Sequence, residues 1–294
     1  MQISGILPAL VTPLDENGKF LPESLALLLE RCYRAGIDGV YVGGQTGEGL
    51  LQSTAMRAEA IRVAVENSPA GKSVIAHVGS ASTSVAVTLA RQAAKHGAHA
   101  ISSLPPSEAG SFAEVKQYFV ELAAATDLPL LVYHFPDRSP LASTHQALTE
   151  LLEIESVVGI KFTDYNLYTL ARLKQLGTCV LNGRDEVLAA GLLMGADGGI
   201  GSFYNLVPGL FVELYGQTRT GDWSGARKSQ DRINELIEIT LRFPIFAAIK
   251  VMLSWSGIPC GRPIAPHAAL TPMQETALRE ALTQAGFAPD GFCN

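Results

Sequence analysis

A single lysine, Lys161, lies within a short apolar run that has the composition of a buried strand. The run covers residues 157–164 and reads Val-Val-Gly-Ile-Lys-Phe-Thr-Asp. Burying an ammonium group without a partner is costly, and lysine is rarely found fully buried. One interpretation, favoured by the strand alone, is a structural lysine held in a salt bridge or at an exposed edge. The other is an amine whose burial favours the neutral form, which can attack a carbonyl carbon.

Two further features offer groups that could act beside such an amine. The loop over residues 43–48 reads Gly-Gly-Gln-Thr-Gly-Glu, and its unhindered backbone N–H groups suit a carboxylate. Tyr133 lies in another apolar run and carries a phenol. Each feature alone is a weak signal, because glycine-rich loops are often plain turns and a strand-end tyrosine usually packs in the core. Glu48 is expected to bond within its loop, and we assign it no acid–base role.

The rest of the chain alternates eight times between strand-like and helical segments. Apolar runs typical of strands cover residues 5–13, 39–47, 73–80, 100–106, 128–136, 157–164, 178–182 and 198–204. Helical segments follow these runs and begin near residues 22, 54, 83, 111, 144, 166, 187 and 208. Apolar strands separated by amphipathic helices are typical of a parallel sheet covered on both faces. Eight such units predict an α/β protein with a closed (β/α)₈ TIM barrel.

A doubly wound sheet is the competing architecture. Such a sheet usually has a G-x-G-x-x-G loop after its first strand. Here the first strand ends in Val11-Thr12-Pro13, which does not fit that pattern. The barrel is therefore the preferred fold.

The alternation stops after residue 220. Residues 222–242, 246–255 and 271–285 all have helical patterns, with no strand-like run between them. We therefore predict a barrel over residues 1–220 and a helical C-terminal extension over residues 221–294 that packs on the barrel. An oligomer interface is a second, compatible use of this extension.

Active sites of such barrels lie at the carboxyl ends of the strands and in the loops that follow them. The residues that this rule selects are Gly44, Gln45, Thr46, Tyr133, Arg138, Lys161, Thr163, Gly183, Asp185, Glu186 and Ser202. Because side chains alternate along a strand, Lys161 and Thr163 point the same way. An inward lysine beneath an inward threonine is unusual in a barrel interior, where branched apolar residues dominate. It indicates a small polar ligand.

Composition and charge exclude several other classes of protein. The chain has 294 residues, of which 47% are hydrophobic and 17% charged, and this is typical of a compact soluble protein. A net charge of −6 argues against a nucleic-acid surface, and no apolar run is long enough to predict a membrane span. The first residues lack the basic and apolar regions of a signal peptide, which favours a cytoplasmic protein.

The cysteines and histidines of the chain are not spaced as metal ligands. The scattered cysteines Cys32, Cys179, Cys260 and Cys293 are expected to be reduced and structural rather than zinc ligands. There is no P-loop, H-E-x-x-H or G-x-S-x-G motif. Only His77 and His134 of the six histidines lie on predicted strands, and each is expected to be structural.

Taken together, these motifs resemble one known family. The resemblance rests on the loop over residues 43–48, the Tyr133 strand, the Gly-Ile-Lys run ending at Lys161, and the Gly-Ala-Asp-Gly-Gly-Ile-Gly-Ser run over residues 195–202. Together they resemble the dihydrodipicolinate synthase / N-acetylneuraminate lyase family, over nearly the whole chain. The resemblance implies the same barrel, a homotetramer, and a reaction that uses neither a metal nor an organic cofactor.

The resemblance also implies roles for the candidate residues. Lys161 would form a Schiff base with the ketone carbon of a small 2-oxo acid such as pyruvate, and Tyr133 would relay protons. Thr46, with its neighbours Gly44 and Gln45, would hold the substrate carboxylate. These roles agree with the chemistry, because a protonated imine stabilises the enamine left by C–C cleavage and a phenol can exchange a proton with the aldehyde oxygen.

Within the family, residues 41–48, 75–79 and 182–186 resemble the N-acetylneuraminate lyase branch. The positions that bind the polyhydroxylated tail in that branch are occupied here by Thr163, Gly183, Asp185, Glu186 and Ser202. Adjacent carboxylates suit this task, since each accepts hydrogen bonds from hydroxyl groups. The sequence therefore predicts a class I aldolase that cleaves a 2-oxo-3-deoxy sugar acid, similar to N-acetylneuraminate, into pyruvate and an aldehyde.

Three departures from the family pattern leave alternatives open. Gln45 stands where a serine or threonine is usual, and residues 105–111 lack a tyrosine that many members present to a neighbouring subunit. Arg138 stands where the synthase branch keeps an arginine for the carboxylate of its second substrate. The alternatives are a 4-hydroxy-tetrahydrodipicolinate synthase that condenses pyruvate with aspartate semialdehyde, and a dehydratase of a related sugar acid. An alternative of another class is a catalytically weak homologue that only binds a 2-oxo acid.

Overall fold

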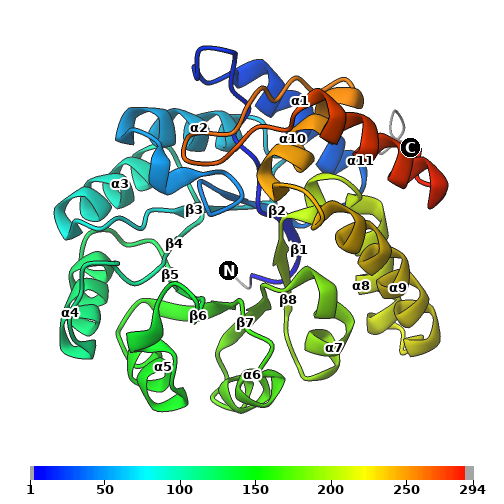
Figure 1. Cartoon of the computed structure of the whole chain (residues 1–294). Coiled ribbons are helices and arrows are strands. Elements are labelled where there is room, and N and C mark those ends of the chain that lie inside the picture. The colour runs from blue at the N-terminus through cyan, green and yellow to red at the C-terminus, as the bar shows by residue number, and fades with distance from the viewer. Residues whose placement is uncertain (1–2, 289–294) are drawn as a thin grey trace.

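Eight parallel strands form a ring, which Figure 1 shows end-on. The computed structural model describes residues 3–288. The strands in this part of the chain are β1 (Gly5–Pro8), β2 (Gly39–Val42), β3 (Ser73–His77), β4 (Ala100–Ser103), β5 (Leu130–His134), β6 (Val157–Phe162), β7 (Cys179–Asn182) and β8 (Gly198–Gly201). Neighbours pair in the order β1-β8-β7-β6-β5-β4-β3-β2. A bridge between Ala9 and Tyr41 joins the two ends of this order, so the predicted (β/α)₈ barrel is confirmed.

Helices surround the ring. They are α1 (Pro22–Arg34), α2 (Thr54–Glu66), α3 (Thr83–Lys95), α4 (Phe112–Ala123), α5 (His145–Leu152), α6 (Leu167–Lys174), α7 (Leu188–Leu193) and α8 (Pro208–Arg219). Short 3₁₀ helices lie in the connections: η1 (Gly49–Leu51), η2 (Pro140–Ala142), η3 (Asp185–Val187) and η4 (Phe203–Asn205). The helix positions follow the predicted ones closely because local signals fix the ends. Ser53, for example, accepts a hydrogen bond from the Met56 N–H and caps α2.

The strands are shorter than the apolar runs that predict them. The first run extends to Pro13, but β1 ends at Pro8. The last run extends to Tyr204, yet β8 ends at Gly201 and the chain turns directly into η4. The apolar residues beyond the strand ends are buried in the loops of the barrel mouth, which is why their hydrophobicity does not mark the strand boundary.

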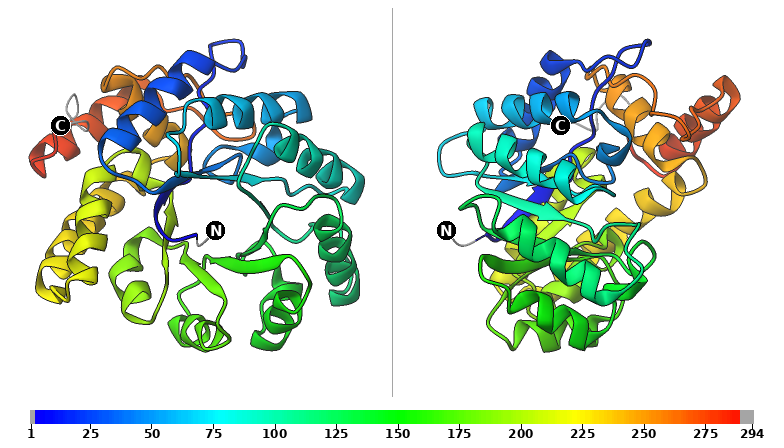
Figure 2. Two further views of the ribbon diagram at one scale, coloured as in Figure 1. Left: turned by 180° about the vertical axis from the view of Figure 1, so that it is seen from behind. Right: turned by 90° about the vertical axis from the view of Figure 1, so that its left-hand side faces the viewer.

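Three further helices follow the barrel: α9 (Trp223–Thr240), α10 (Ile245–Trp255) and α11 (Pro272–Gln284). They lie together on one side of the ring, as Figures 1 and 2 show. Helix α9 packs along α8 and also contacts α10 and α11. The predicted helical extension is confirmed, while its treatment as a unit separated at residue 220 stays a prediction.

The apolar core has two layers, because alternate residues of each strand face opposite ways. One layer lies between the strands and the helices and includes Val132 of β5 and Ile160 of β6. The other fills the barrel interior and consists of Ile3, Leu7, Ala9, Tyr41, Ile75, Ala100, Leu104, Leu131, Tyr133, Leu181 and Ile200. Alternate residues of β6 face this inner layer, and Lys161 is one of them. The strand geometry alone therefore directs Lys161 into the barrel.

Two other sequence expectations concern cysteines and the membrane. Cys32, Cys179 and Cys260 form no disulfide with one another, whereas Cys293 lies outside the described residues. None of the helices between residues 3 and 288 combines the length and the apolar character that crossing a bilayer requires.

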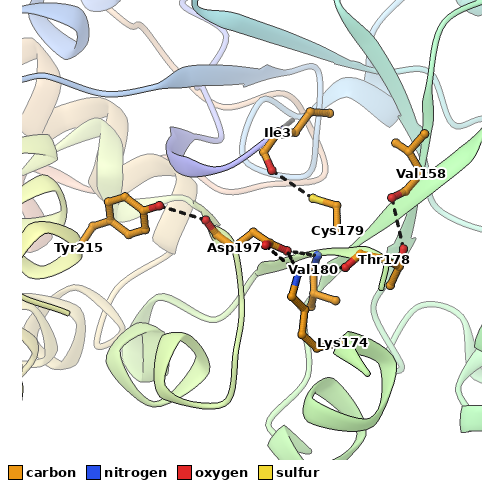
Figure 3. Close-up of polar contacts among 8 residues, drawn as sticks. All are labelled: Ile3, Val158, Lys174, Thr178, Cys179, Val180, Asp197 and Tyr215. Carbon is orange, nitrogen blue, oxygen red and sulfur yellow. Dashed lines mark hydrogen bonds and ion pairs between the residues drawn. The ribbon is translucent and has the colours of Figure 1, made fainter. Parts of the chain in front are cut away.

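A polar network ties together the amino ends of the strands, at the end of the barrel opposite its mouth (Figure 3). Lys174 Nζ lies 2.7 Å from both carboxylate oxygens of Asp197, which directly precedes β8. The Val180 N–H donates to Asp197 Oδ2 at 2.8 Å, and Lys174 also donates to the Thr178 carbonyl at 3.2 Å. Since active sites of TIM barrels lie at the other end, this network is expected to serve stability.

We expect the replacement Lys174→Met to destabilise the fold without changing catalysis. It leaves Asp197 largely buried without its cationic partner, which should cost about 1–3 kcal/mol, less than for a fully buried pair because the ion pair is partly solvated. Urea unfolding would measure the loss. A substantial change in KM of the variant for its substrate would contradict this assignment.

Candidate active site

Lys161 lies on the inner face of β6 and is almost completely buried. It stands in register with Tyr133 on the adjacent strand β5, so the two inward side chains meet. Lys161 Nζ lies 4.0 Å from the centroid of the Tyr133 ring and 4.4 Å from that of Tyr41 on β2. No ion pair joins Lys161 to a carboxylate within residues 3–288, so a salt-bridged or edge lysine does not describe this site.

The surroundings of Lys161 favour its neutral form. Burial lowers the pKa of Lys161 from 10.5 to about 7, and the negative charge of Asp185 opposes part of this change. At neutral pH a large fraction of the amine is therefore unprotonated, which is the form that attacks a carbonyl carbon. Burial also raises the pKa of the Tyr133 phenol, so this group keeps its proton at neutral pH.

Asp185, the first residue of η3, is the carboxylate that acts on Lys161 through its charge. Its side chain is buried, and Oδ2 accepts a hydrogen bond of 2.8 Å from the Phe203 N–H. Burial raises the pKa of Asp185 from 3.8 to about 7. The carboxylate lies so close to β8 that a Cβ atom on Gly201 would come within 1.9 Å of Oδ1. Glycine at this position makes room for Asp185 at the barrel mouth.

The glycine-rich loop after β2 lies beside the loop after β8. Thr46 Oγ1 and Ser202 Oγ share a hydrogen bond of 2.6 Å, which brings two predicted site residues together. Gly44 packs against Tyr41, since an added Cβ atom would lie 2.6 Å from the ring. The side-chain nitrogen of Gln45 is buried and has no hydrogen-bond partner in the part of the chain that the structure describes.

Thr163 and Gly183 also meet at the mouth. The Gly183 N–H donates to the Phe162 carbonyl at 2.7 Å, which extends the β6–β7 pairing towards the loops. A Cβ atom at position 183 would lie 2.0 Å from Thr163 Oγ1, so a larger residue would displace the hydroxyl. Thr163 is buried on the same face of the chain as Lys161, as strand alternation predicts.

The remaining candidates, Glu186 and Arg138, lie further out. The Tyr165 hydroxyl donates a hydrogen bond to Glu186 Oε1, and both residues are accessible to solvent. Arg138 is exposed on the loop after β5. The structure therefore gathers most of the predicted residues at one end of the barrel, with these two at its outer edge.

Arg184 is a neighbour of the site that the sequence analysis did not select. Its guanidinium carbon lies 4.4 Å from the ring centroid of Tyr165 and 5.3 Å from that of Phe135. Its Nη2 also pairs with Asp137 at 3.2 Å. These partners come from the loops after β5 and β6, so only the folded chain shows that Arg184 links three loops of the mouth.

The two strand histidines have structural environments, as predicted. His77 Nδ1 donates to the Gly43 carbonyl at 3.0 Å, and Nε2 accepts from the Leu104 N–H at 3.3 Å. His134 Nε2 lies 3.3 Å from Asp164 Oδ2. Burial lowers the pKa of both rings, which keeps them neutral. The hydrogen bonds of His77 hold the ends of β2, β3 and β4 together beneath the glycine-rich loop.

The expectation that Glu48 bonds within its own loop is wrong. Its carboxylate is fully buried and forms an ion pair of 2.5 Å with Lys250 of α10. The sequence analysis missed Lys250 because it lies in the middle of an apolar helix and has no local partner. A lysine in such a surrounding was nevertheless a signal for a distant carboxylate.

The site therefore combines a buried amine whose pKa is lowered to about 7, a protonated phenol beside it, and a loop with hydroxyl and backbone donors. An amine of this kind can form an imine with a ketone, and the phenol can exchange a proton with a substrate oxygen. The barrel mouth adds the buried carboxyl group of Asp185 and the hydroxyl groups of Thr163 and Ser202.

Three kinds of comparison with known proteins agree with this geometry. The N-acetylneuraminate lyase of Rhizobium meliloti (strain 1021) is 36% identical over 285 residues, which cover 96% of this chain and 95% of that protein. The structure of CdNal from Clostridium difficile in complex with mannosamine superposes with a TM-score of 0.92 at 27% identity, covering 97% of this chain and 100% of that one.

A structure of the Ruminococcus gnavus sialic acid aldolase, a catalytic lysine mutant, has a TM-score of 0.92 at 27% identity and covers 97% of this chain and 98% of that one. The dihydrodipicolinate synthetase family profile matches residues 2–285. That match spans the barrel and the helical extension together. The chain therefore belongs to the dihydrodipicolinate synthetase family, as the sequence motifs predict.

Proposed function

We propose that this protein is a class I aldolase that cleaves a 2-oxo-3-deoxy sugar acid of the N-acetylneuraminate type into pyruvate and an aldehyde. The observation that carries the proposal is the buried Lys161 amine, whose Nζ lies 4.0 Å from the Tyr133 ring and whose pKa burial lowers to about 7. The names of its relatives support the same activity, since they include an N-acetylneuraminate lyase and a sialic acid aldolase with a catalytic lysine.

The reaction begins when Lys161 Nζ attacks the ketone carbon, C2, and water leaves to give a protonated imine. The C3–C4 bond then breaks, and its electron pair moves into the imine to form an enamine. The Tyr133 phenol gives its proton to the hydroxyl that leaves C2 as water, and the resulting phenolate takes the proton of the C4 hydroxyl as the aldehyde forms. Protonation of C3 and hydrolysis of the imine release pyruvate and regenerate the amine.

The other residues bind the two ends of the substrate. Thr46 and the amides around Gly44 and Gln45 hold the carboxylate next to the ketone. Thr163, Gly183, Asp185, Glu186 and Ser202 contact the hydroxylated tail, and Arg138 borders it. The resemblance to the N-acetylneuraminate lyase branch supports this division, and the hydrogen bond between Thr46 and Ser202 brings the two groups of residues next to each other. The reaction needs no metal or organic cofactor, and we place it in the cytoplasm in a homotetramer.

The test of this proposal has two parts. The protein is incubated with pyruvate and borohydride, and the adduct is located by mass spectrometry of peptides; reduction on Lys161 is expected. N-acetylneuraminate and shorter 2-oxo-3-deoxy acids are then screened for release of pyruvate. No adduct, or an adduct on another lysine, would contradict the Schiff base, and turnover of pyruvate with an amino-aldehyde alone would contradict the lyase activity.

A synthase reaction with aspartate semialdehyde is the second candidate, and Arg138 favours it. The guanidinium is exposed at the mouth, where it could accept a second carboxylate. The adjacent carboxyl groups of Asp185 and Glu186 oppose this alternative because they would repel the carboxylate of the second substrate. The same substrate screen separates the two candidates.

The rate of imine formation is expected to depend on pH through Lys161. The pKa of about 7 means that the rate rises with pH up to about 7 and changes little above 8. Because the charge of Asp185 raises the pKa of Lys161, the variant Asp185→Asn should move the midpoint to lower pH. Quenching the pyruvate reaction into borohydride after short times at each pH measures this. A midpoint near the ordinary lysine value would show that the amine is not desolvated in solution.

A further inference from the structure

A buried ion pair connects the glycine-rich loop to the helical extension. Glu48 Oε1 and Lys250 Nζ lie 2.5 Å apart, and both side chains are completely excluded from solvent. Glu48 ends the loop that carries Thr46, whereas Lys250 lies in α10, which Figure 1 shows in orange next to the barrel. The pair thus joins the barrel mouth to a segment beyond the eight strand–helix units.

Each charged group has a second partner in the backbone. Lys250 Nζ donates to the Arg262 carbonyl at 3.2 Å, and the Ile264 N–H donates to Glu48 Oε2. The segment that contains these two residues is itself fixed to the barrel, because the Leu14 N–H donates to the Cys260 carbonyl at 3.0 Å. The Glu48 carboxylate therefore contacts two other parts of the chain, namely α10 at Lys250 and the following segment at Ile264.

The loop conformation that Glu48 completes is unusual. Glu48 has a φ of 57°, a left-handed conformation that costs free energy for a residue other than glycine. The loop folds back on itself, since the Glu48 N–H donates to the Gln45 carbonyl at 2.9 Å and the Gly49 N–H to the Gly44 carbonyl at 3.1 Å. A Cβ atom at Gly49 would lie 1.8 Å from the Gly43 carbonyl oxygen, which shows how closely the two ends of the loop approach.

A fully buried ion pair is a poor means of stabilising a fold, because desolvation of both charges offsets their attraction. Such pairs can instead select one conformation, since each charge must meet its partner. Here the conformation concerned is that of the loop with Thr46 and its amides. We propose that Glu48 and Lys250 are positioning residues, through which the helical extension sets the loop that binds the substrate carboxylate. This inference rests on the proposed function, which assigns the carboxylate to that loop.

The test compares a double variant, Glu48→Gln with Lys250→Met, against the single variant Lys250→Met and the wild type. Removing both charges avoids an uncompensated buried carboxylate, so the double variant should melt at a higher temperature than the single one. For the double variant we expect the half-saturating pyruvate concentration in borohydride trapping to rise about tenfold or more. The maximal trapping rate should change by less than about threefold. A folded double variant with unchanged half-saturation would overturn the proposal.

Two controls separate loop positioning from general stability and from imine chemistry. Lys174→Met removes an ion pair at the other end of the barrel. The half-saturating pyruvate concentration of this variant should be unchanged, although the variant is less stable than the wild type. Calorimetric titration with pyruvate in a Lys161→Met background measures carboxylate binding without an imine. If removal of the Glu48–Lys250 pair in this background weakens pyruvate binding, the inference is supported even when the wild type forms no adduct. Equal pyruvate binding with and without the pair contradicts it.

Discussion

Replacement of Lys161 by methionine is expected to abolish turnover, with a loss of at least about 10⁴-fold, because no other group can form the imine. Methionine has a similar volume and should fill the space between the Tyr41 and Tyr133 rings. The borohydride adduct with pyruvate should disappear from the intact mass of the variant. Circular dichroism and the melting temperature provide the control that the barrel remains folded.

The same variant should be more stable than the wild type at neutral and mildly acidic pH. The pKa of Lys161 falls from 10.5 in the unfolded chain to about 7 in the folded protein. Between these values the unfolded chain binds a proton that the folded chain does not, so stability rises with pH across this range. The lysine therefore destabilises the fold most below pH 7, by an amount on the order of 5 kcal/mol at about 1.4 kcal/mol for each pKa unit.

Melting temperatures of the wild type and of Lys161→Met between pH 6 and 10 would measure this difference. We expect the advantage of the variant to be largest at pH 6 and to shrink as the pH approaches 10. A variant that is less stable than the wild type at every pH would mean that the amine makes favourable contacts that outweigh its desolvation.

The barrel could be predicted from the sequence because its signals are local. Apolar runs and amphipathic helices alternate within short windows, and a cap such as Ser53 marks where a helix begins. That Lys161 and Thr163 share one face of the strand followed from side-chain alternation in the same way. The contact between Lys161 and Tyr133 did not, because it depends on the register of two strands, which the long connection between them does not fix.

The features that the sequence did not reveal all join distant segments. The pairing of Glu48 with Lys250, and the packing of Arg184 against Phe135 and Tyr165, depend on where the loops and α10 meet in space. Each of these residues has an ordinary local explanation, as a loop carboxylate, a helix lysine or a solvated arginine. Only the tertiary arrangement shows which residue each of them contacts. Sequence patterns could therefore identify the chemical groups of the site, but not the contacts that hold those groups in place.

The Tyr133 phenol is the second group whose removal should have a large effect. Tyr133→Phe keeps the ring that packs 4.0 Å from Lys161 Nζ, so imine formation with pyruvate should persist. The C–C bond cleavage should slow by about 10²- to 10⁴-fold, because the variant lacks the proton carrier for the aldehyde oxygen. Burial raises the pKa of Tyr133, so the group rests as a phenol, gives up its proton as the imine forms and takes one back from the C4 hydroxyl.

Tyr41→Phe is the matched control, because the Tyr41 ring also lies against Lys161, at 4.4 Å. The Tyr41 hydroxyl donates to Ser102 Oγ at 3.1 Å, and this bond engages it within the neighbouring strands. Its loss should cost stability of about 1 kcal/mol and change the rate far less than the loss of the Tyr133 hydroxyl. The comparison uses pyruvate trapping and aldehyde release for each variant. Equal slowing of cleavage in both variants would mean that the rings, and not the Tyr133 proton, determine the rate.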